Sequence, residues 1–258
     1  MISAMSFPGL DDHLVEAEVT RDEIIGGVRV VLSPAHEPHA TQHNELNYLV
    51  RGHVAPGYVV ASDLLTRHDE ESDFATSTCV RKKGVDPETD GRYLQEIAFE
   101  VVSEQKHRCV REKALRMHRR GVRRIFAVWV EDPRVAEWSS ESQSWRPLAA
   151  DSRIEDPCFV APLAVAALFD PEAADNAVIA ALAAKGNPAI RQREAEGEAR
   201  GEVKGEAASI LKVLEARGVS VNEAQRQEIL RCRDLDRLDR WLRRATQASS
   251  ADEILADS

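Results

Sequence analysis

The sequence, which is 258 residues long, lacks several features that would assign a class of protein at once. It has no apolar run of the roughly 18–20 residues that a membrane-spanning helix requires. Its first residues are acidic and lack the basic-then-apolar pattern of a secretory signal. We therefore expect a cytoplasmic protein with no membrane partner.

Several catalytic and metal-binding motifs are also absent. There is no G-x-S-x-G, Walker loop or G-x-G-x-x-G, so serine hydrolase, nucleotidase and dinucleotide enzyme functions have no support. Cysteine is scarce, and Cys79, Cys109, Cys158 and Cys232 form no C-x-x-C pair and have no histidine at zinc spacing. We expect four free thiols in a reducing compartment.

Positive charge is in deficit overall, with 34 basic against 44 acidic residues and a net charge of −10. This balance argues against a protein that coats nucleic acid, because phosphate binding requires positive charge. Residues 106–124 are the exception, since they hold nine Lys and Arg but only one acidic residue, Glu112. A local charge of +8 predicts a surface that follows a phosphate backbone, although a solvated helix face is the alternative.

Apolar periodicity predicts a mixed α/β core with a central sheet flanked by helices. Residues 125–130 (IFAVWV) form an unbroken apolar run, which is typical of a strand that is covered on both faces. We expect strands at residues 24–33, 58–65, 73–78, 94–103, 125–130 and 135–139, and helices at residues 40–53 and 106–120.

The C-terminal part of the sequence predicts an all-helical tail. Gly197, Gly201 and Gly205 are each followed by Glu, and a period of four places them along one stripe of a helix. This repeat predicts either a linker or lone helix, or a close contact between helices. We divide the chain into a loose segment (1–22), a core (23–150), a connecting helical region (151–188), the Gly-Glu repeat (189–206) and a tail of three short helices (207–248).

Three residues of the core form the most informative constellation. Asp73 opens one predicted strand, Glu100 lies late in the next, and Lys113 lies on the helix that follows. Two carboxylates on neighbouring strands are able to share a hard divalent cation, and a nearby lysine is able to orient water or stabilise a transition state. Glu100 shares a strand face with Ala98 and Val102, where a charge is costly unless it is paired or bound to metal. An ion pair with a neighbouring Arg or Lys is the alternative.

These residues resemble the PD-(D/E)XK nuclease superfamily, in its bacterial restriction-endonuclease-like branch of unknown function. The resemblance covers roughly residues 20–140, and the tail resembles those of transposase-associated nuclease-like proteins. The matching positions are Glu23 and Gly27, Ser33-Pro34 and His43, Ser72-Asp73, Glu100 to Ser103, Lys113, and Gly121 to Trp129. The resemblance implies a Mg²⁺ or Mn²⁺ ion held by Asp73, Glu100 and the Val101 carbonyl.

The sequence departs from the family pattern at several of these positions. Ser72 replaces the proline before the aspartate, Val102 stands at the usual lysine position, and Cys109 replaces an acidic residue. The resemblance therefore implies that Lys113 supplies the catalytic cation, with Lys106 as a substitute. Additional metal ligands are expected at His43 or Glu45 on the first helix, although either is equally compatible with a solvated position.

Two functions follow from these observations. The first is a Mg²⁺-dependent endonuclease acting on nucleic acid, with DNA favoured, whose phosphate contacts are Arg116, Arg119, Arg120 and Arg123. The second is a catalytically silent nuclease-like fold that serves as an interaction module. Because three helices of about ten residues bury little area alone, we also predict a homodimer held by residues 190–245. The alternatives are a tail that folds back on its own core or a flexible arm that recruits another protein.

Overall fold

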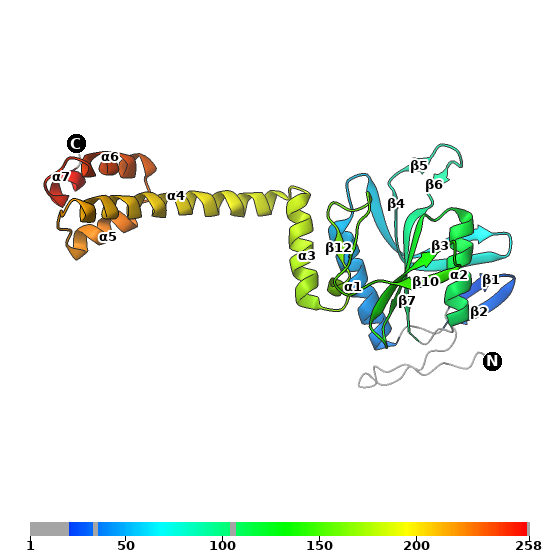
Figure 1. Cartoon of the computed structure of the whole chain (residues 1–258). Coiled ribbons are helices and arrows are strands. Elements are labelled where there is room, and N and C mark those ends of the chain that lie inside the picture. The colour runs from blue at the N-terminus through cyan, green and yellow to red at the C-terminus, as the bar shows by residue number, and fades with distance from the viewer. Residues whose placement is uncertain (1–20, 33–35, 104–106, 257–258) are drawn as a thin grey trace, which may run out of the picture. The chain divides into compact units, whose positions relative to one another are not determined.

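A computed structural model describes residues 21–32, 36–103 and 107–256 (Figure 1). The chain forms two compact units, with the boundary between Lys185 and Gly186. Each unit has its own hydrophobic core. None of the described helices combines the length and the apolar character that crossing a membrane requires.

The first unit contains an eight-stranded mixed sheet. Its strand order is β10-β9-β8-β7-β4-β1-β2, and β3 also pairs with β4. Only β7 and β8 pair in parallel, and helix α2 connects them. The strands are β1 (Arg21–Ile25), β2 (Val28–Leu32), β3 (Tyr58–Asp69), β4 (Ser72–Lys82), β7 (Gln95–Val102), β8 (Arg124–Trp129), β9 (Arg134–Ser139) and β10 (Ser144–Pro147).

Three α-helices, a 3-10 helix and four short strands complete the described part of the first unit. They include two small two-stranded sheets, β5 with β6 and β11 with β12. The elements are α1 (Glu37–His53), β5 (Val85–Asp86), β6 (Gly91–Arg92), α2 (His107–Arg120), β11 (Arg153–Ile154), β12 (Leu163–Ala164), the 3-10 helix η1 (Ala166–Leu168) and α3 (Pro171–Ala184).

Strand alternation divides the core into two layers on the two faces of the sheet. Ile97, Phe99 and Val101 of β7 face a cluster that includes residues of α1 and α3. Ala98 faces the opposite cluster, in which Ala114 and Met117 of α2 take part. Glu100 has the same alternation as Ala98, so the sheet directs its carboxylate toward α2.

The second unit is helical and consists of α4 (Pro188–Ala216), α5 (Glu223–Arg231), α6 (Leu235–Ala245) and α7 (Ala251–Leu255). Its core includes Ile210, Leu214 and Trp241. Residues 189–206, the Gly-Glu repeat, form the first part of α4 as regular helix. Three glycines at interior helical positions cost about 3 kcal/mol relative to alanine. Nothing in the described chain lies within 4 Å of a Cβ added to any of them, so no intramolecular contact requires glycine there.

Candidate active site

The candidate site lies where two strands share one edge of β4. Strand β3 pairs along β4, so β7 and β1 must both use its other edge, at Thr78–Arg81 and at Asp73 respectively. Between them the edge of β4 has no strand partner. Two buried carboxylates accept the backbone N–H groups of this gap: Glu23 Oε1 accepts from Ala75 N at 2.9 Å, and Glu100 accepts from Ser77 N.

Lys113 of α2 fills the space between these carboxylates. Its Nζ lies 2.7 Å from Glu23 Oε2 and 3.7 Å from Glu100 Oε2, and it donates to the Ala75 carbonyl at 3.3 Å. The side chains of all three charged residues are 3% exposed or less. The structure thus brings two of the predicted catalytic residues, Glu100 and Lys113, to one buried point.

Burial sets the protonation of this cluster. It raises the pKa of Glu100 from 4.5 to about 7, with Lys113 acting to lower it and Glu23 acting to raise it further. Burial also acts to lower the pKa of Lys113, but Glu100 and Glu23 outweigh this effect and raise it. Lys113 therefore stays protonated, while Glu100 gains or loses a proton near neutral pH.

Two stacked, uncharged rings lie beside Lys113. Lys113 Nζ lies 5.2 Å from the centroid of the Phe74 ring, against which the His68 ring stacks at 4.0 Å. Burial is the largest effect that lowers the pKa of His68, to about 4. The imidazole is therefore uncharged at neutral pH and adds no positive charge beside Lys113.

A break in the β3–β4 ladder lies at Asp63 and Ser77, across β4 from Glu100. Residues Ser62↔Thr78 and Leu64↔Thr76 pair, whereas Asp63 and Ser77 between them do not, and Asp63 has a left-handed φ of +49°. Asp63 lies close enough to Glu100 to act to raise its pKa. Sequence reasoning missed Asp63, although an acidic residue within the strand sequence YVVASDLL was a signal.

Ser77, which lies at this break, contacts strand β7 through its hydroxyl group and helix α1 through its carbonyl group. Its hydroxyl oxygen accepts from Val101 N at 3.2 Å, and its carbonyl oxygen lies 2.5 Å from His43 Nε2. The other histidine of this face of α1, His39, places Nδ1 3.1 Å from Ser103 Oγ. His43 therefore contacts the strand segment opposite Glu100, and its side chain is not simply a solvated helix residue.

Asp73 lies elsewhere. Ser77 is opposite Glu100, so Asp73 is four residues further along β4, about 13 Å at the usual rise of a strand. Its carboxylate forms two hydrogen bonds with Arg67, at 2.8 and 2.6 Å, and this guanidinium is the largest effect that lowers the pKa of Asp73. The structure does not bring Asp73 to Glu100. Ser72, in place of the family's proline, is buried and accepts a hydrogen bond from Gly26 N.

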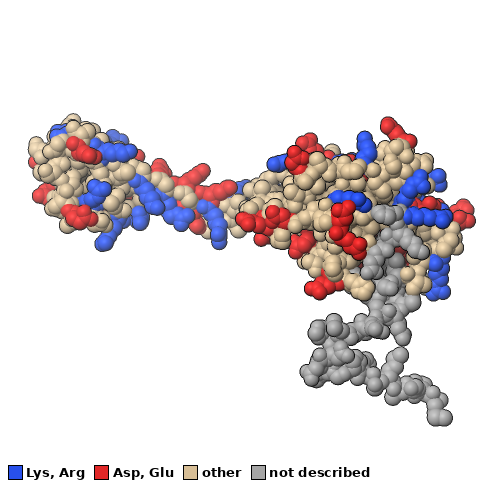
Figure 2. All heavy atoms as spheres, turned by 60° about the horizontal axis from the view of Figure 1, so that its bottom comes forward, with Lys and Arg blue, Asp and Glu red and all other residues tan. Residues whose placement is uncertain are grey.

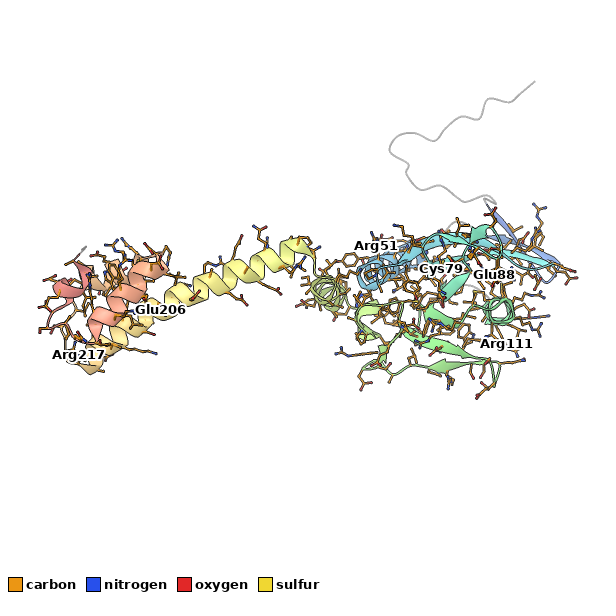
Figure 3. All side chains as sticks on the ribbon, turned by 90° about the horizontal axis from the view of Figure 1, so that it is seen from above. Arg51, Cys79, Glu88, Arg111, Glu206 and Arg217 are labelled. Atoms are coloured by element: carbon orange, nitrogen blue, oxygen red, sulfur yellow. The ribbon has the colours of Figure 1, made fainter. Side chains whose placement is uncertain are left out.

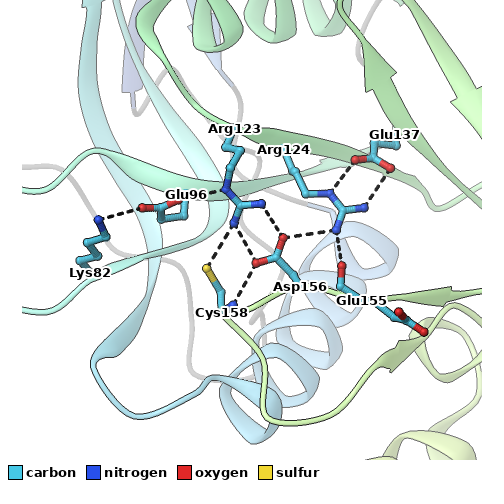
Figure 4. Close-up of polar contacts among 8 residues, drawn as sticks. All are labelled: Lys82, Glu96, Arg123, Arg124, Glu137, Glu155, Asp156 and Cys158. Carbon is cyan, nitrogen blue, oxygen red and sulfur yellow. Dashed lines mark hydrogen bonds and ion pairs between the residues drawn. The ribbon is translucent and has the colours of Figure 1, made fainter.

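The four arginines expected to contact phosphate divide into two groups. Arg119 and Arg120 are exposed, and no ion pair of the described residues includes them. Arg116 pairs with Asp69 and Glu112. Arg123 pairs with Glu96 and, through two hydrogen bonds of 2.8 Å, with Asp156 (Figure 4).

Arg124 extends the same network. It binds Glu137 through two nitrogens, at 2.7 and 3.0 Å, and its Nη1 donates to the Glu155 carbonyl (Figure 4). The Asp156 side chain is 1% exposed. Burial acts to raise the pKa of Asp156, but the bonds from Arg123 and the Cys158 amide outweigh it and lower that pKa. This part of the basic segment therefore ties α2 and β8 to the segment before β12.

Two further candidate residues lie away from Glu100 or outside the described chain. Glu45 lines a pocket of about 340 Å³ that Gln42 and Phe169 also line. Lys106 lies outside the described residues. All four cysteines are free, as expected from their scatter in the sequence.

The oxygen atoms available at Glu100 and near it are suitable ligands for a hard divalent cation. Glu100 Oε1 is buried and has no hydrogen-bond partner among the described residues, and Glu23 and Asp63 add carboxylates nearby. The described residues hold no preformed group of three His, Cys, Asp or Glu side chains. Mg²⁺ usually needs only one or two protein carboxylates, with water and substrate phosphate completing its ligands.

Comparison with known proteins places the fold. No family model and no curated protein sequence matches the chain. A solved structure from Anabaena variabilis, described as a candidate nuclease belonging to DUF820, is similar with a TM-score of 0.50 and 16% sequence identity. The similarity covers 57% of this chain and 89% of that chain. At this identity the likeness concerns the fold alone, and it confirms a mixed α/β architecture similar to that of this candidate nuclease.

Proposed function

We propose that the first unit is a metal-dependent nuclease that hydrolyses phosphodiester bonds of nucleic acid, with DNA as the substrate. The proposal rests on the buried Glu100 carboxylate in a nuclease-like fold. One of its oxygens has no hydrogen-bond partner among the described residues, and the carboxylate lies beside Lys113. A carboxylate without a full set of partners is costly in the interior of a protein. A cation that arrives with the substrate offsets this cost.

In this proposal Glu100 and the Val101 carbonyl hold Mg²⁺ or Mn²⁺. A metal bound there polarises the phosphodiester and favours deprotonation of the attacking water. Lys113 keeps its proton, so it offers a fixed positive charge to the phosphoryl oxygens as negative charge develops on them. Ser77 fixes the strand segment that carries Glu100 and Val101.

The second carboxylate is Asp63 or Asp73, and the two make different predictions. Asp63 already lies close enough to Glu100 to affect its pKa. Asp73 satisfies the family motif but must leave Arg67 and move toward the site. Loss of cleavage in Asp63→Asn alone indicates that Asp63 is the second carboxylate. Loss of cleavage in Asp73→Asn alone indicates that Asp73 moves to the site when substrate binds.

The experiment is cleavage of plasmid and single-stranded DNA with Mn²⁺, comparing wild type with Glu100→Gln, Asp63→Asn and Asp73→Asn. Glu88→Gln is the matched control, because Glu88 is exposed in the turn between β5 and β6 (Figure 3). We expect loss of cleavage in Glu100→Gln and in one aspartate variant, and none in the control. Equal cleavage by wild type and Glu100→Gln contradicts the proposal.

A metal-binding readout complements cleavage. A ligand that binds only the folded state raises the melting temperature, so Mg²⁺ or Mn²⁺ is expected to stabilise wild type but not Glu100→Gln. Absence of both cleavage and metal-linked stabilisation in wild type favours the silent interaction module instead.

A further inference from the structure

The first four turns of α4 are uncovered within the second unit. Residues 191–202 are exposed except for Gly197, which is partly buried, and the packed face of the helix begins at Val203. In Figure 3 the side chains before Glu206 have no other helix of the tail beside them. An isolated helical segment of this length is marginal in water, and its glycines weaken it further.

The charges of this segment do not stabilise it internally. Among the described residues, no ion pair joins side chains between Ile190 and Glu206, and the one hydrogen bond between side chains there links Gln192 to Glu196. The segment is therefore an exposed helix without the i,i+4 pairs that usually support one.

The charges instead follow the glycine stripe on its two sides. At 100° per residue, the Glu three positions before each glycine lies about 60° to one side of it. Arg200 and Lys204, three positions after Gly197 and Gly201, lie about 60° to the other side, and Arg193, four positions before Gly197, lies about 40° to that same side. The acidic edge is Glu194, Glu198 and Glu202, and the basic edge is Arg193, Arg200 and Lys204. Figure 2 shows acidic and basic side chains on opposite edges of α4.

These edges are complementary to a second copy in one orientation only. When two identical helices pack face to face and run in the same direction, a two-fold axis parallel to them places each acidic edge against the partner's basic edge. When they run in opposite directions, like edges meet, and like charges repel. We propose that the face of α4 centred on Gly197, Gly201 and Gly205 binds the same face of a second copy of this chain, with the two helices parallel.

The glycines allow the charged edges of the two α4 helices to come into contact. They follow an i±4 row, and helices that pack along such rows cross at about 50° and touch over a few turns. The six edge charges and three glycines span residues 193–205, about 18 Å of helix. A missing side chain at the crossing allows the backbones to approach closely, which brings the flanking charges within reach. This inference does not depend on the proposed nuclease activity.

Charge reversal of the full-length chain tests the pairing. Sedimentation equilibrium or light scattering at tens of micromolar is expected to show a dimer for wild type. Arg193→Glu/Arg200→Glu/Lys204→Glu is expected to raise the dissociation constant at least tenfold, because all edges are then acidic. The matched variant Glu194→Lys/Glu198→Lys/Glu202→Lys is also expected to be monomeric, and mixing the two variants restores a dimer. Failure of the mixture to associate contradicts the parallel pairing.

Gly201→Leu tests close approach without endangering the fold. Leucine is a better helix former than glycine, and no described atom lies within 4 Å of its Cβ position, so helix content measured by circular dichroism is expected to hold or rise. The dimer is nevertheless expected to dissociate. Ala195→Leu is the control, because Ala195 is exposed on a different face of the same helix. A wild-type monomer at 100 µM, or a dimer unaffected by Gly201→Leu and both charge reversals, overturns the proposal.

Discussion

Replacement of Glu100 by glutamine tests two roles for its carboxylate. If the carboxylate binds a ligand, its charge destabilises the metal-free protein; if it is a structural ion-pair partner of Lys113, its charge stabilises the protein. Burial raises the pKa of Glu100 from 4.5 to about 7. A raised pKa means that the folded protein holds the proton more tightly than the unfolded chain does. The resulting stabilisation is complete below pH 4.5 and is lost as the pH rises through 7. At about 1.4 kcal/mol for each pH unit, the loss amounts to about 3 kcal/mol.

The assay is thermal unfolding of the metal-free protein at pH 5 and at pH 8. Glutamine has the shape of protonated glutamate, so the variant and wild type are expected to have nearly equal stability at pH 5. At pH 8 the variant is expected to be more stable by about 3 kcal/mol, roughly 6–12 °C in melting temperature for a unit of this size. A variant that is less stable than wild type at pH 8 refutes this reasoning, because Lys113 then stabilises the charged carboxylate by more than burial costs.

Three further outcomes follow from the structure. Lys113→Met is expected to lower the single-turnover cleavage rate at least a hundredfold while duplex affinity, measured by fluorescence anisotropy, changes little. Asp156→Asn is expected to lower the free energy of unfolding by about 2–4 kcal/mol in urea at pH 7. Because the pKa of Asp156 is lowered, this difference is expected to shrink as the pH falls below 3.8. Arg119→Ala/Arg120→Ala is expected to reduce the slope of log affinity against log salt by about two. Arg123→Ala, whose guanidinium is already paired, is expected to leave that slope unchanged.

The elements with strong periodicity could be predicted from the sequence. The expected strands at residues 94–103 and 125–130 correspond to β7 and β8, and the expected helix at residues 106–120 corresponds to α2. Their apolar patterns are dictated by burial, which a single segment records by itself. This is also why Glu100 stood out, since its position on a buried face followed from strand alternation alone.

The turn at Gly26-Gly27 was harder to predict from the sequence. Residues 24–33, where Gly26-Gly27 predicts a turn or a bulge within β-branched sequence, belong to the hairpin of β1 and β2, because Gly26 and Gly27 adopt left-handed φ values of 60° and 72° and reverse the chain. The reversal leaves β1 as a separate strand beside β4, and this position brings Glu23 to Lys113. A glycine pair signals a turn or a bulge equally well in sequence, and only pairing decides between them.

The rest of the candidate site depends on contacts between distant segments. Glu23 and Glu100 both reach Lys113 because β1 and β7 share one edge of β4, while Asp63 lies on β3 at the other edge. Sequence spacing contains no information on which strands are neighbours in a sheet. For this reason the motif directed attention to Asp73, whereas Asp63 is the aspartate whose charge acts to raise the pKa of Glu100.

The two proposals concern the two places where the choice of residue works against the stability of the isolated chain. At Glu100 an apolar residue fits a buried strand better, and along α4 alanine forms a better helix than Gly197, Gly201 or Gly205. Residues that break a local rule, and whose intramolecular contacts do not offset the cost, are best explained by a binding event that supplies the gain. The two costs are separable by experiment. The first varies with pH and metal but not with protein concentration, whereas the second varies with protein concentration and salt but not with metal.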